Sequence, residues 1–161
     1  MRHLFAPWRF TYVSQADAAV TCVFCAAAAS DDDALTLAKS QRAFALLNRY
    51  PYTSGHTMVA PLAHVGDLAT LDAATLAEMM ALTQRVVRAL QRSYRPHGFN
   101  LGANLGEAAG AGIADHLHLH VVPRWRGDTN FMSVNADVRV LPEELTVTCA
   151  KLKAALEDDH A

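Results

Sequence analysis

The sequence predicts an α+β fold: a mainly antiparallel sheet of about five strands, one long helix that crosses it, and a C-terminal helix. Five short apolar runs bounded by turn residues indicate the strands, and one long segment with apolar residues every three or four positions indicates the crossing helix. Strands and helices do not alternate along the chain, so a doubly wound parallel sheet is not expected. The 161 residues suit a single domain over 1–161, with a core at about 20–142 and a terminal helix at about 143–157.

The apolar runs follow one another between clear turn signals. Residues 51–55 separate the second run from the third, and the glycine-rich stretch 102–112 precedes the fifth. Before the first run, the small residues 26–30 are followed by three aspartates at 31–33, which we interpret as an exposed loop. The expected strands are 35–38, 43–48, 57–60, 99–103 and 117–122.

The crossing helix is expected at about 73–93, between the third and fourth strands. Asp72 can cap its start, and Pro96 and Gly98 end it, because the residue before a proline resists helical geometry. Its apolar face carries Leu76, Met79, Met80, Val86, Val87, Leu90 and Tyr94. We expect these side chains, the two methionines included, to belong to the core.

Composition excludes several classes of protein. A net charge of -2 provides no basic surplus for a nucleic-acid backbone, although a small anionic ligand is still possible. No apolar run reaches the roughly 20 residues that span a bilayer, so no membrane partner is expected. The first residues do not resemble a secretory signal, which makes the cytoplasm the expected location.

Three histidines, His116, His118 and His120, alternate with apolar residues at the period of a strand. Alternate strand side chains point to one face, so the imidazoles are expected on one side and Leu117 and Leu119 on the other. Three residues on one straight strand cannot all reach one metal ion, which favours nucleophilic catalysis. A neutral His118 could attack phosphorus to form a phosphoramidate, and His120 could donate a hydrogen bond or proton to the departing oxygen.

The chain contains three cysteines, at positions 22, 25 and 149. An odd number argues against a disulfide framework, so Cys22 and Cys25 indicate half of a metal site, a redox pair or a reduced thiol pair in the core. Two soft ligands at this spacing are typical of structural zinc, which two histidines would complete. We expect Cys149 to be a buried thiol of the last helix.

Two further features suit a nucleotide. Phe44, Leu46 and Asn48 share one face of a strand, where two apolar surfaces and an amide could hold a base and a ribose; otherwise Phe44 and Leu46 belong to the core. In 104–112, glycines at 106, 110 and 112 could bring backbone N–H groups close to a phosphate, unless the segment is simply a flexible loop. We assign His56 a structural role.

The segment HLHLHVV at 116–122 resembles the signature of the histidine triad (HIT) superfamily, in which three histidines alternate with apolar residues. The resemblance covers most of 5–142 and also includes APWRFTYV, CVFC, LLNRYPYTSGHTMVAPLAHVGDL, GFNLGANLGEAAGAG and PRWRGDTNF. It is strongest for the branch of fragile histidine triad hydrolases and bacterial diadenosine polyphosphate hydrolases and phosphorylases.

The resemblance implies a HIT-like fold, a homodimer and a covalent nucleotidyl-histidine intermediate. His118 takes the position of the nucleophile and His120 that of the phosphate and leaving-group residue, while Asn48 takes the position that binds ribose hydroxyls. Zinc would be structural, and no catalytic cofactor is implied. The implied zinc ligands are Cys22, Cys25, His64 and His116.

The expected function is a nucleotide phosphohydrolase or nucleotidyltransferase that cleaves diadenosine polyphosphates or related nucleotide conjugates. A phosphate-dependent diadenosine tetraphosphate phosphorylase and a zinc-stabilised nucleotide-binding protein without turnover both stay open. The chain departs from the fragile histidine triad pattern at Leu105, where a phosphate-contacting glutamine is expected. Leucine cannot donate a hydrogen bond, so Asn104 or backbone amides of the loop would have to stabilise the phosphate charge.

Overall fold

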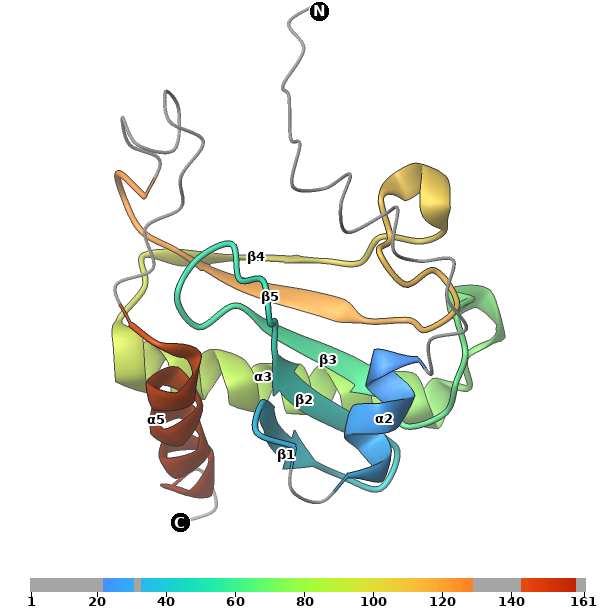
Figure 1. Ribbon diagram of the computed structural model, residues 1–161, viewed down its shortest axis with the longest axis horizontal. Helices are drawn as coiled ribbons and strands as arrows, with labels where there is room; N and C mark the ends of the chain where they lie inside the picture. The colour runs from blue at the N-terminus through green and yellow to red at the C-terminus, as the bar shows by residue number, and fades with distance from the viewer. Residues whose placement is uncertain (1–21, 31–32, 129–142, 159–161) are drawn as a thin grey trace, which may run out of the picture.

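The computed structural model describes residues 22–30, 33–128 and 143–158, which form one antiparallel five-stranded sheet with helices on both faces (Figure 1). The strand order across the sheet is β1-β2-β3-β5-β4. The strands are β1 Thr36–Lys39, β2 Ala43–Leu47, β3 Thr57–Pro61, β4 Gly98–Gly102 and β5 Leu119–Arg124. The predicted α+β class is therefore confirmed, while the parts of the expected core before residue 22 and at 129–142 lie outside the described residues.

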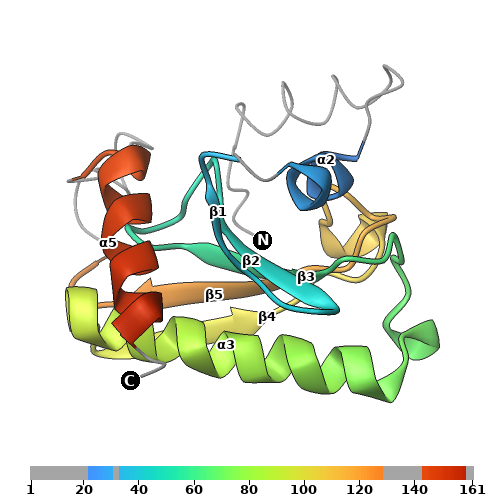
Figure 2. The same ribbon diagram turned by 90° about the horizontal axis from the view of Figure 1, so that it is seen from below.

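Alternation along the strands divides the core between the two faces of the sheet. On one face, Ala45, Leu47 and Val59 pack with α3 (Ala73–Tyr94) and α5 (Leu145–Glu157). On the other face, Phe44, Leu46, Met58 and Ala60 pack with the short helix α2 (Val23–Ala29). Figure 2 shows the sheet between α3 and α2.

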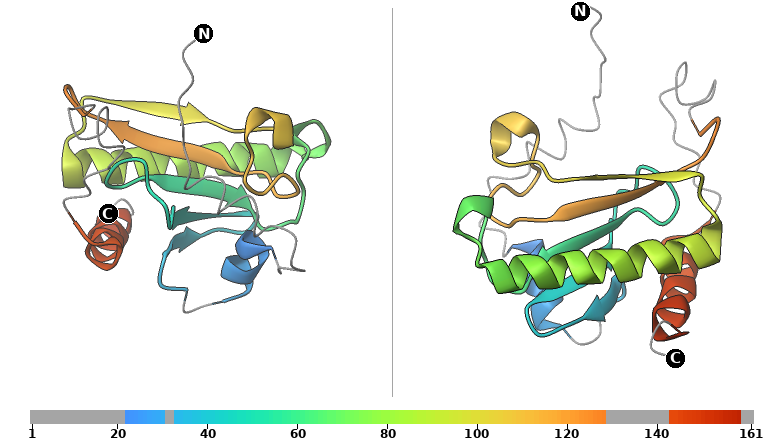
Figure 3. Two further views of the ribbon diagram at one scale, coloured as in Figure 1. Left: turned by 45° about the horizontal axis from the view of Figure 1, so that its top comes forward. Right: turned by 180° about the vertical axis from the view of Figure 1, so that it is seen from behind.

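Helix α3 runs along the back of the sheet, as Figure 3 shows from behind. Its predicted cap is present, because the Asp72 carboxylate accepts hydrogen bonds from the Thr75 N–H at 3.0 Å and the Thr75 hydroxyl at 2.6 Å. The helix ends at Arg95, which has left-handed backbone angles. Leu76 and Met80 were wrongly predicted to be core residues, since they are 40% and 44% exposed. The sheet therefore covers only part of the apolar face of α3 and leaves Leu76 and Met80 exposed.

The segment before the first strand was also predicted incorrectly. Residues 26–29 belong to α2, so the expected exposed loop is in large part a helix. Lys39 holds the C-terminal end of this helix, where its ammonium group donates to the carbonyl oxygens of Ala28 and Ser30 at 2.9 and 2.6 Å. Among the helices that the structure describes, none combines the length and apolar character that a membrane crossing requires.

Candidate active site and metal centre

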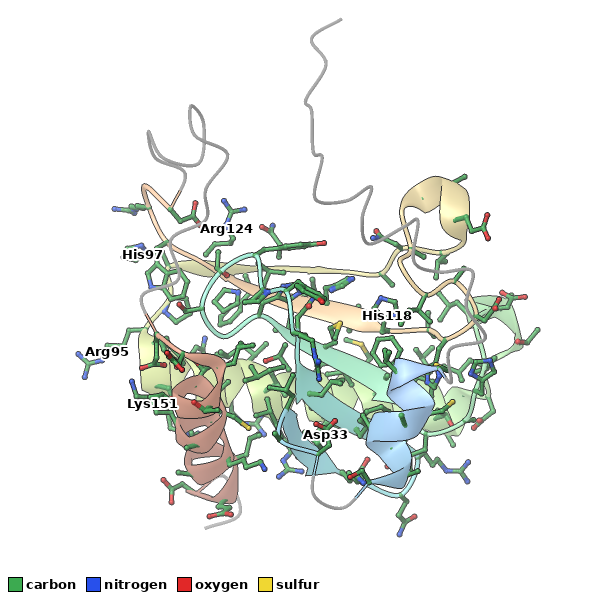
Figure 4. The ribbon with its side chains drawn as sticks, in the orientation of Figure 1. Asp33, Arg95, His97, His118, Arg124 and Lys151 are labelled. Atoms are coloured by element: carbon green, nitrogen blue, oxygen red, sulfur yellow. The ribbon has the colours of Figure 1, made fainter. Side chains whose placement is uncertain are left out.

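The three alternating histidines lie just before β5 and in its first residues, on the same side of the sheet as α2. Only His120 lies within β5, while His116 and His118 precede it. The rings of His118 and His120 meet edge to face, with centroids 5.0 Å apart. Figure 4 shows His118 near α2, far from His97 at the other end of the sheet. The chain is therefore less straight here than a regular strand, so His116 can take part in a separate cluster.

His118 is held with one ring nitrogen free for chemistry. Its Nδ1 lies 2.8 Å from the carbonyl oxygen of His116, so Nδ1 carries the hydrogen and donates it. Nε2 of the neutral ring therefore holds the lone pair. The residue is 7% exposed, and burial lowers the pKa of His118, which the hydrogen bond to the carbonyl opposes only in part. A neutral imidazole with a free Nε2 has the form that a nucleophile requires.

His120 is oriented by a residue that the sequence analysis left outside the site. The backbone N–H of Tyr52 donates to Nδ1 of His56 at 3.1 Å, which places the hydrogen of a neutral His56 on Nε2. That Nε2 lies 3.0 Å from Nδ1 of His120 and donates to it. The remaining hydrogen of a neutral His120 is then on Nε2. The fully buried His56 thus determines which nitrogen of His120 can donate.

The charge state of His120 is set mainly by burial. Burial, followed by the proximity of His118, lowers the pKa of His120 to about 4. At neutral pH this side chain is therefore a neutral imidazole, which can donate a hydrogen bond from Nε2 but carries no extra proton to deliver as imidazolium. Such a donor suits a leaving group that needs no proton, for example a phosphate of low basicity.

The four predicted metal ligands lie together. The ligand atoms of Cys22, Cys25, His64 and His116 are all within 4.8 Å of one another. Nδ1 of His64 and His116 are 3.3 Å apart, and Sγ of Cys25 is 3.3 and 3.6 Å from them. Zinc bond lengths in a regular tetrahedron give edges of about 3.3 Å between nitrogens and about 3.6 Å between sulfur and nitrogen. The distances among Cys25, His64 and His116 therefore match those of a tetrahedral zinc site.

Neighbouring backbone groups prepare this cluster for a metal. His116 donates from Nε2 to the carbonyl oxygen of Pro61 at 2.9 Å, which leaves Nδ1 without a hydrogen and directed at the cysteines. The N–H of Leu117 donates to the carbonyl oxygen of Val65 at 2.7 Å. Gly66 permits this close approach, because a Cβ there would lie 2.5 Å from the carbonyl oxygen of Ala114.

The residues predicted to contact a nucleotide lie on the histidine face but differ in accessibility. Phe44 is fully buried and Leu46 is 6% exposed, so both form part of the core around α2. Leu46 pairs with Met58, which pairs in turn with His120. Asn48 is less buried, and its Oδ1 accepts from the N–H of Tyr50 at 2.8 Å. This hydrogen bond holds the side-chain amide of Asn48 beside the apolar surface that Leu46 and Met58 form next to His120.

The glycine-rich segment forms a structured turn before the histidines. Gly106 and Gly110 have positive φ angles of 80° and 88° on either side of a short 3-10 helix, η2 (Glu107–Ala109). The Asn104 side chain donates to the carbonyl oxygen of Gly110 at 3.3 Å. Leu105 is 48% exposed and lines an open cavity of about 830 Å³ shared with His64. Asn104 therefore closes the turn, and Gly112 lies exposed just beyond it.

Comparison with known proteins identifies the family. Residues 30–127 match the model of the HIT domain, which is more than half of the chain. The chain belongs to the HIT family. It is 40% identical over 157 residues to a Mycobacterium tuberculosis protein named AP-4-A phosphorylase, with 92% of this chain and 80% of that protein covered.

Solved HIT structures have the same fold. A zinc-bound histidine triad family protein from Mycobacterium smegmatis superposes with a TM-score of 0.72 at 35% identity, covering 87% of this chain and 96% of that one. A hypothetical histidine triad nucleotide-binding protein from Sulfolobus tokodaii gives a TM-score of 0.71 at 26% identity, covering 85% of this chain and 93% of that one. The predicted HIT-like fold is thus confirmed. Two of the HIT histidines of this chain belong to separate groups. His116 is part of the four-residue cluster of candidate metal ligands, and His120 is paired with His56 by a hydrogen bond.

Proposed function

We propose that this HIT protein is an enzyme that cleaves diadenosine polyphosphates, or related nucleotide conjugates, through a nucleotidyl-histidine intermediate. One observation carries the proposal: the hydrogen bonds around His118 and His120 leave a free Nε2 lone pair on the first and an Nε2–H donor on the second. The similarity to a protein named AP-4-A phosphorylase supports the class of substrate.

The reaction has two steps. Nε2 of His118 attacks the α-phosphorus, and an N–P bond forms as the bond from phosphorus to the bridging oxygen breaks. The departing nucleotide carries the negative charge away and accepts a hydrogen bond from Nε2–H of His120. Water or inorganic phosphate then attacks the same phosphorus, which breaks the N–P bond and restores the lone pair, and the proton that an attacking water loses passes to the solvent. Water gives a nucleoside monophosphate, whereas inorganic phosphate gives a nucleoside diphosphate.

Two surfaces would bind the substrate: the apolar residues of β2 beside Asn48, and the glycine-rich turn that precedes the histidines. Leu46, beside Phe44 on the same face of β2, would contact the base, and Asn48 would bind the ribose hydroxyls. The backbone N–H of Gly112, with Asn104, would hold the phosphates, since backbone N–H groups at glycines are good anion ligands. The N–H of Gly110 already donates to the carbonyl oxygen of Glu107 at 2.8 Å, so Gly110 would contribute by shaping the turn. No catalytic cofactor is required by these steps.

We further propose that Cys22, Cys25, His64 and His116 bind one structural zinc ion. The tetrahedral spacing of their ligand atoms and the zinc-bound HIT structure from Mycobacterium smegmatis support this. Zinc would supply a rigid cross-link and no catalytic charge. A reducing compartment such as the cytoplasm keeps the two thiols available, and a homodimer is the expected assembly.

Product analysis tests the activity. Diadenosine tetraphosphate is incubated with the protein, with and without inorganic phosphate, and the products are separated by ion-exchange chromatography. ATP and AMP without phosphate indicate a hydrolase, whereas ADP that forms only with phosphate indicates a phosphorylase. No turnover of this substrate or of other dinucleotides and nucleoside phosphoramidates would reject the enzyme and favour a binding protein.

The variant His118→Asn tests the nucleophile. The Asn amide can still donate to the His116 carbonyl, as Nδ1 of His118 does, but provides no Nε2. We expect kcat to fall at least about a thousandfold with a folded protein. His97→Ala, at the far end of the sheet, is the matched control and should retain wild-type turnover. Unchanged turnover in His118→Asn would disprove the assignment.

A further inference from the structure

Helix α2 brings together two features that the sequence presents separately. Its seven residues follow Cys22 and include Cys25, and between the two cysteines lies Phe24. A helix of this length is not stable in isolation. It has no side-chain N-cap, and neither an acidic first turn nor a basic last turn. Its position therefore depends on contacts at its surface.

The Phe24 ring is one of these contacts, and it lies against the candidate nucleophile. It is 2% exposed, and its centroid is 4.7 Å from that of His118 with the ring planes 29° apart. It is also 5.1 Å from the ring of His116. One aromatic side chain thus packs against a candidate metal ligand and against His118 at the same time.

The hydrogen bond from His118 to the His116 carbonyl fixes only one atom of the imidazole ring. Rotation about that bond would swing Nε2 across the site unless something packs against the face of the ring. Phe24 supplies that packing, since an offset aromatic pair has a preferred separation and tilt. A displacement of about 1 Å in a reacting atom can cost about a hundredfold in rate.

We propose that Phe24 is a positioning residue for His118, and that metal binding by Cys22 and Cys25 aims the nucleophile by holding this ring in place. The inference rests on the proposed function for the identity of the nucleophile and the metal. It adds that the metal affects the rate of turnover through the position of the Phe24 ring, without contacting the reacting atoms. A protein that has lost its metal would still fold around α3 and bind nucleotide, yet it would turn substrate over slowly.

A second route from the metal to His118 exists and must be separated from the first. His116 is both a candidate ligand and, through its carbonyl oxygen, the hydrogen-bond acceptor of His118. A change at the metal could therefore reach His118 along the backbone without Phe24. The two routes differ in one respect, because only the first disappears when the aromatic ring is removed.

The experiment combines Phe24→Leu with removal of the metal. Leucine keeps an apolar side chain under α2 but removes the stacked ring. In protein labelled with ¹³C-histidine, the ring-proton resonances of His118, assigned with His118→Asn, report the ring current of Phe24 directly and need no turnover. Each protein is measured as purified and after treatment with a zinc chelator, with the metal content determined by mass spectrometry.

We expect the chelator to shift the His118 resonances of the wild type in the direction that Phe24→Leu shifts them. In Phe24→Leu itself, the chelator should then have little further effect, which is the non-additivity expected of a shared route. In zinc-loaded Phe24→Leu, kcat should fall about two- to tenfold, the range expected for loss of one aromatic pair, with KM nearly unchanged. Val86→Ala, in the α3 core on the opposite face, should lower the melting temperature without changing kcat or the resonances.

Three results would overturn the inference. A chelator effect of equal size in Phe24→Leu and in the wild type would assign the route to the backbone of His116. An unchanged kcat in Phe24→Leu would reduce Phe24 to an ordinary core residue. A chelator that leaves the wild-type resonances in place would show that the metal does not hold this ring. A wild type without turnover would instead reject the proposed function, while the resonances would still decide whether the metal holds the two rings together.

Discussion

The depressed pKa of His120 has a measurable effect on stability at mildly acidic pH. The folded protein holds this pKa at about 4, against an ordinary value of 6.5 in the unfolded chain. Between these values the unfolded chain binds a proton that the folded chain does not, so acid favours unfolding. The stabilisation is therefore fully present above pH 6.5 and is lost as the pH falls from 6.5 towards 4. Integration from pH 7 to pH 5 gives a loss of about 2 kcal/mol from this side chain alone.

The variant His120→Asn isolates this contribution. Asn can still accept the hydrogen bond from Nε2 of His56 but does not titrate. Urea unfolding followed by circular dichroism, at pH 7 and pH 5 in the same zinc-containing buffer, gives the free energy of unfolding of both proteins. Subtraction removes the parts that both share, which include the lowered pKa values of His116 and His118. We expect the wild type to lose about 2 kcal/mol more than the variant. Equal losses would show that His120 titrates normally.

Three further substitutions test other parts of the structure. His56→Leu removes the donor to His120, so the pKa of His120 should rise in an NMR titration and kcat should fall about tenfold, as for one lost hydrogen bond; an unchanged pKa would contradict the pairing. Gly66→Ala places a methyl group 2.5 Å from the carbonyl oxygen of Ala114 and should lower the free energy of unfolding in urea by about 1–3 kcal/mol. The control Gly98→Ala, where a Cβ has no neighbour within 4 Å, should be close to neutral, and equal stabilities of the two variants would refute the clash. Arg95→Gly relieves a left-handed residue at φ 46° and should raise the free energy of unfolding by about 1 kcal/mol, while a decrease would disprove the strain.

The long helix could be predicted from sequence because its signals are local and repeated. Six turns of apolar spacing, with Asp72 at the start and Pro96 after the end, leave little ambiguity about α3. Helix α2 has only two turns, mostly of alanine, so its sequence shows no alternation of apolar and polar residues from which a helix could be predicted. Its helical form follows from burial of Phe24 and from the Lys39 contacts, which are made by residues distant in sequence.

The candidate site divides in the same way. The alternation of His118 and His120 and the spacing of the cysteines are visible in the sequence, as is the shared parity of Leu46 and Asn48. The role of His56 is not, since its partner lies 64 residues away and the pairing of β3 with β5 is needed to see it. Its one local signal is the spacing of two from Met58, which places both side chains on the face that His120 occupies.

The four clustered ligands also have a consequence for how the chain reaches its folded state. Cys22 and His116 are separated by 94 positions, so an ion that joins them closes a loop of more than half the chain. Such a cross-link restricts the unfolded ensemble as a long-range disulfide does, and its entropic effect grows slowly with loop length. During synthesis the cysteine pair emerges long before β5 exists to deliver His116. Tight capture of the proposed zinc ion would therefore be a late event, which would mark completion of the sheet rather than its nucleation.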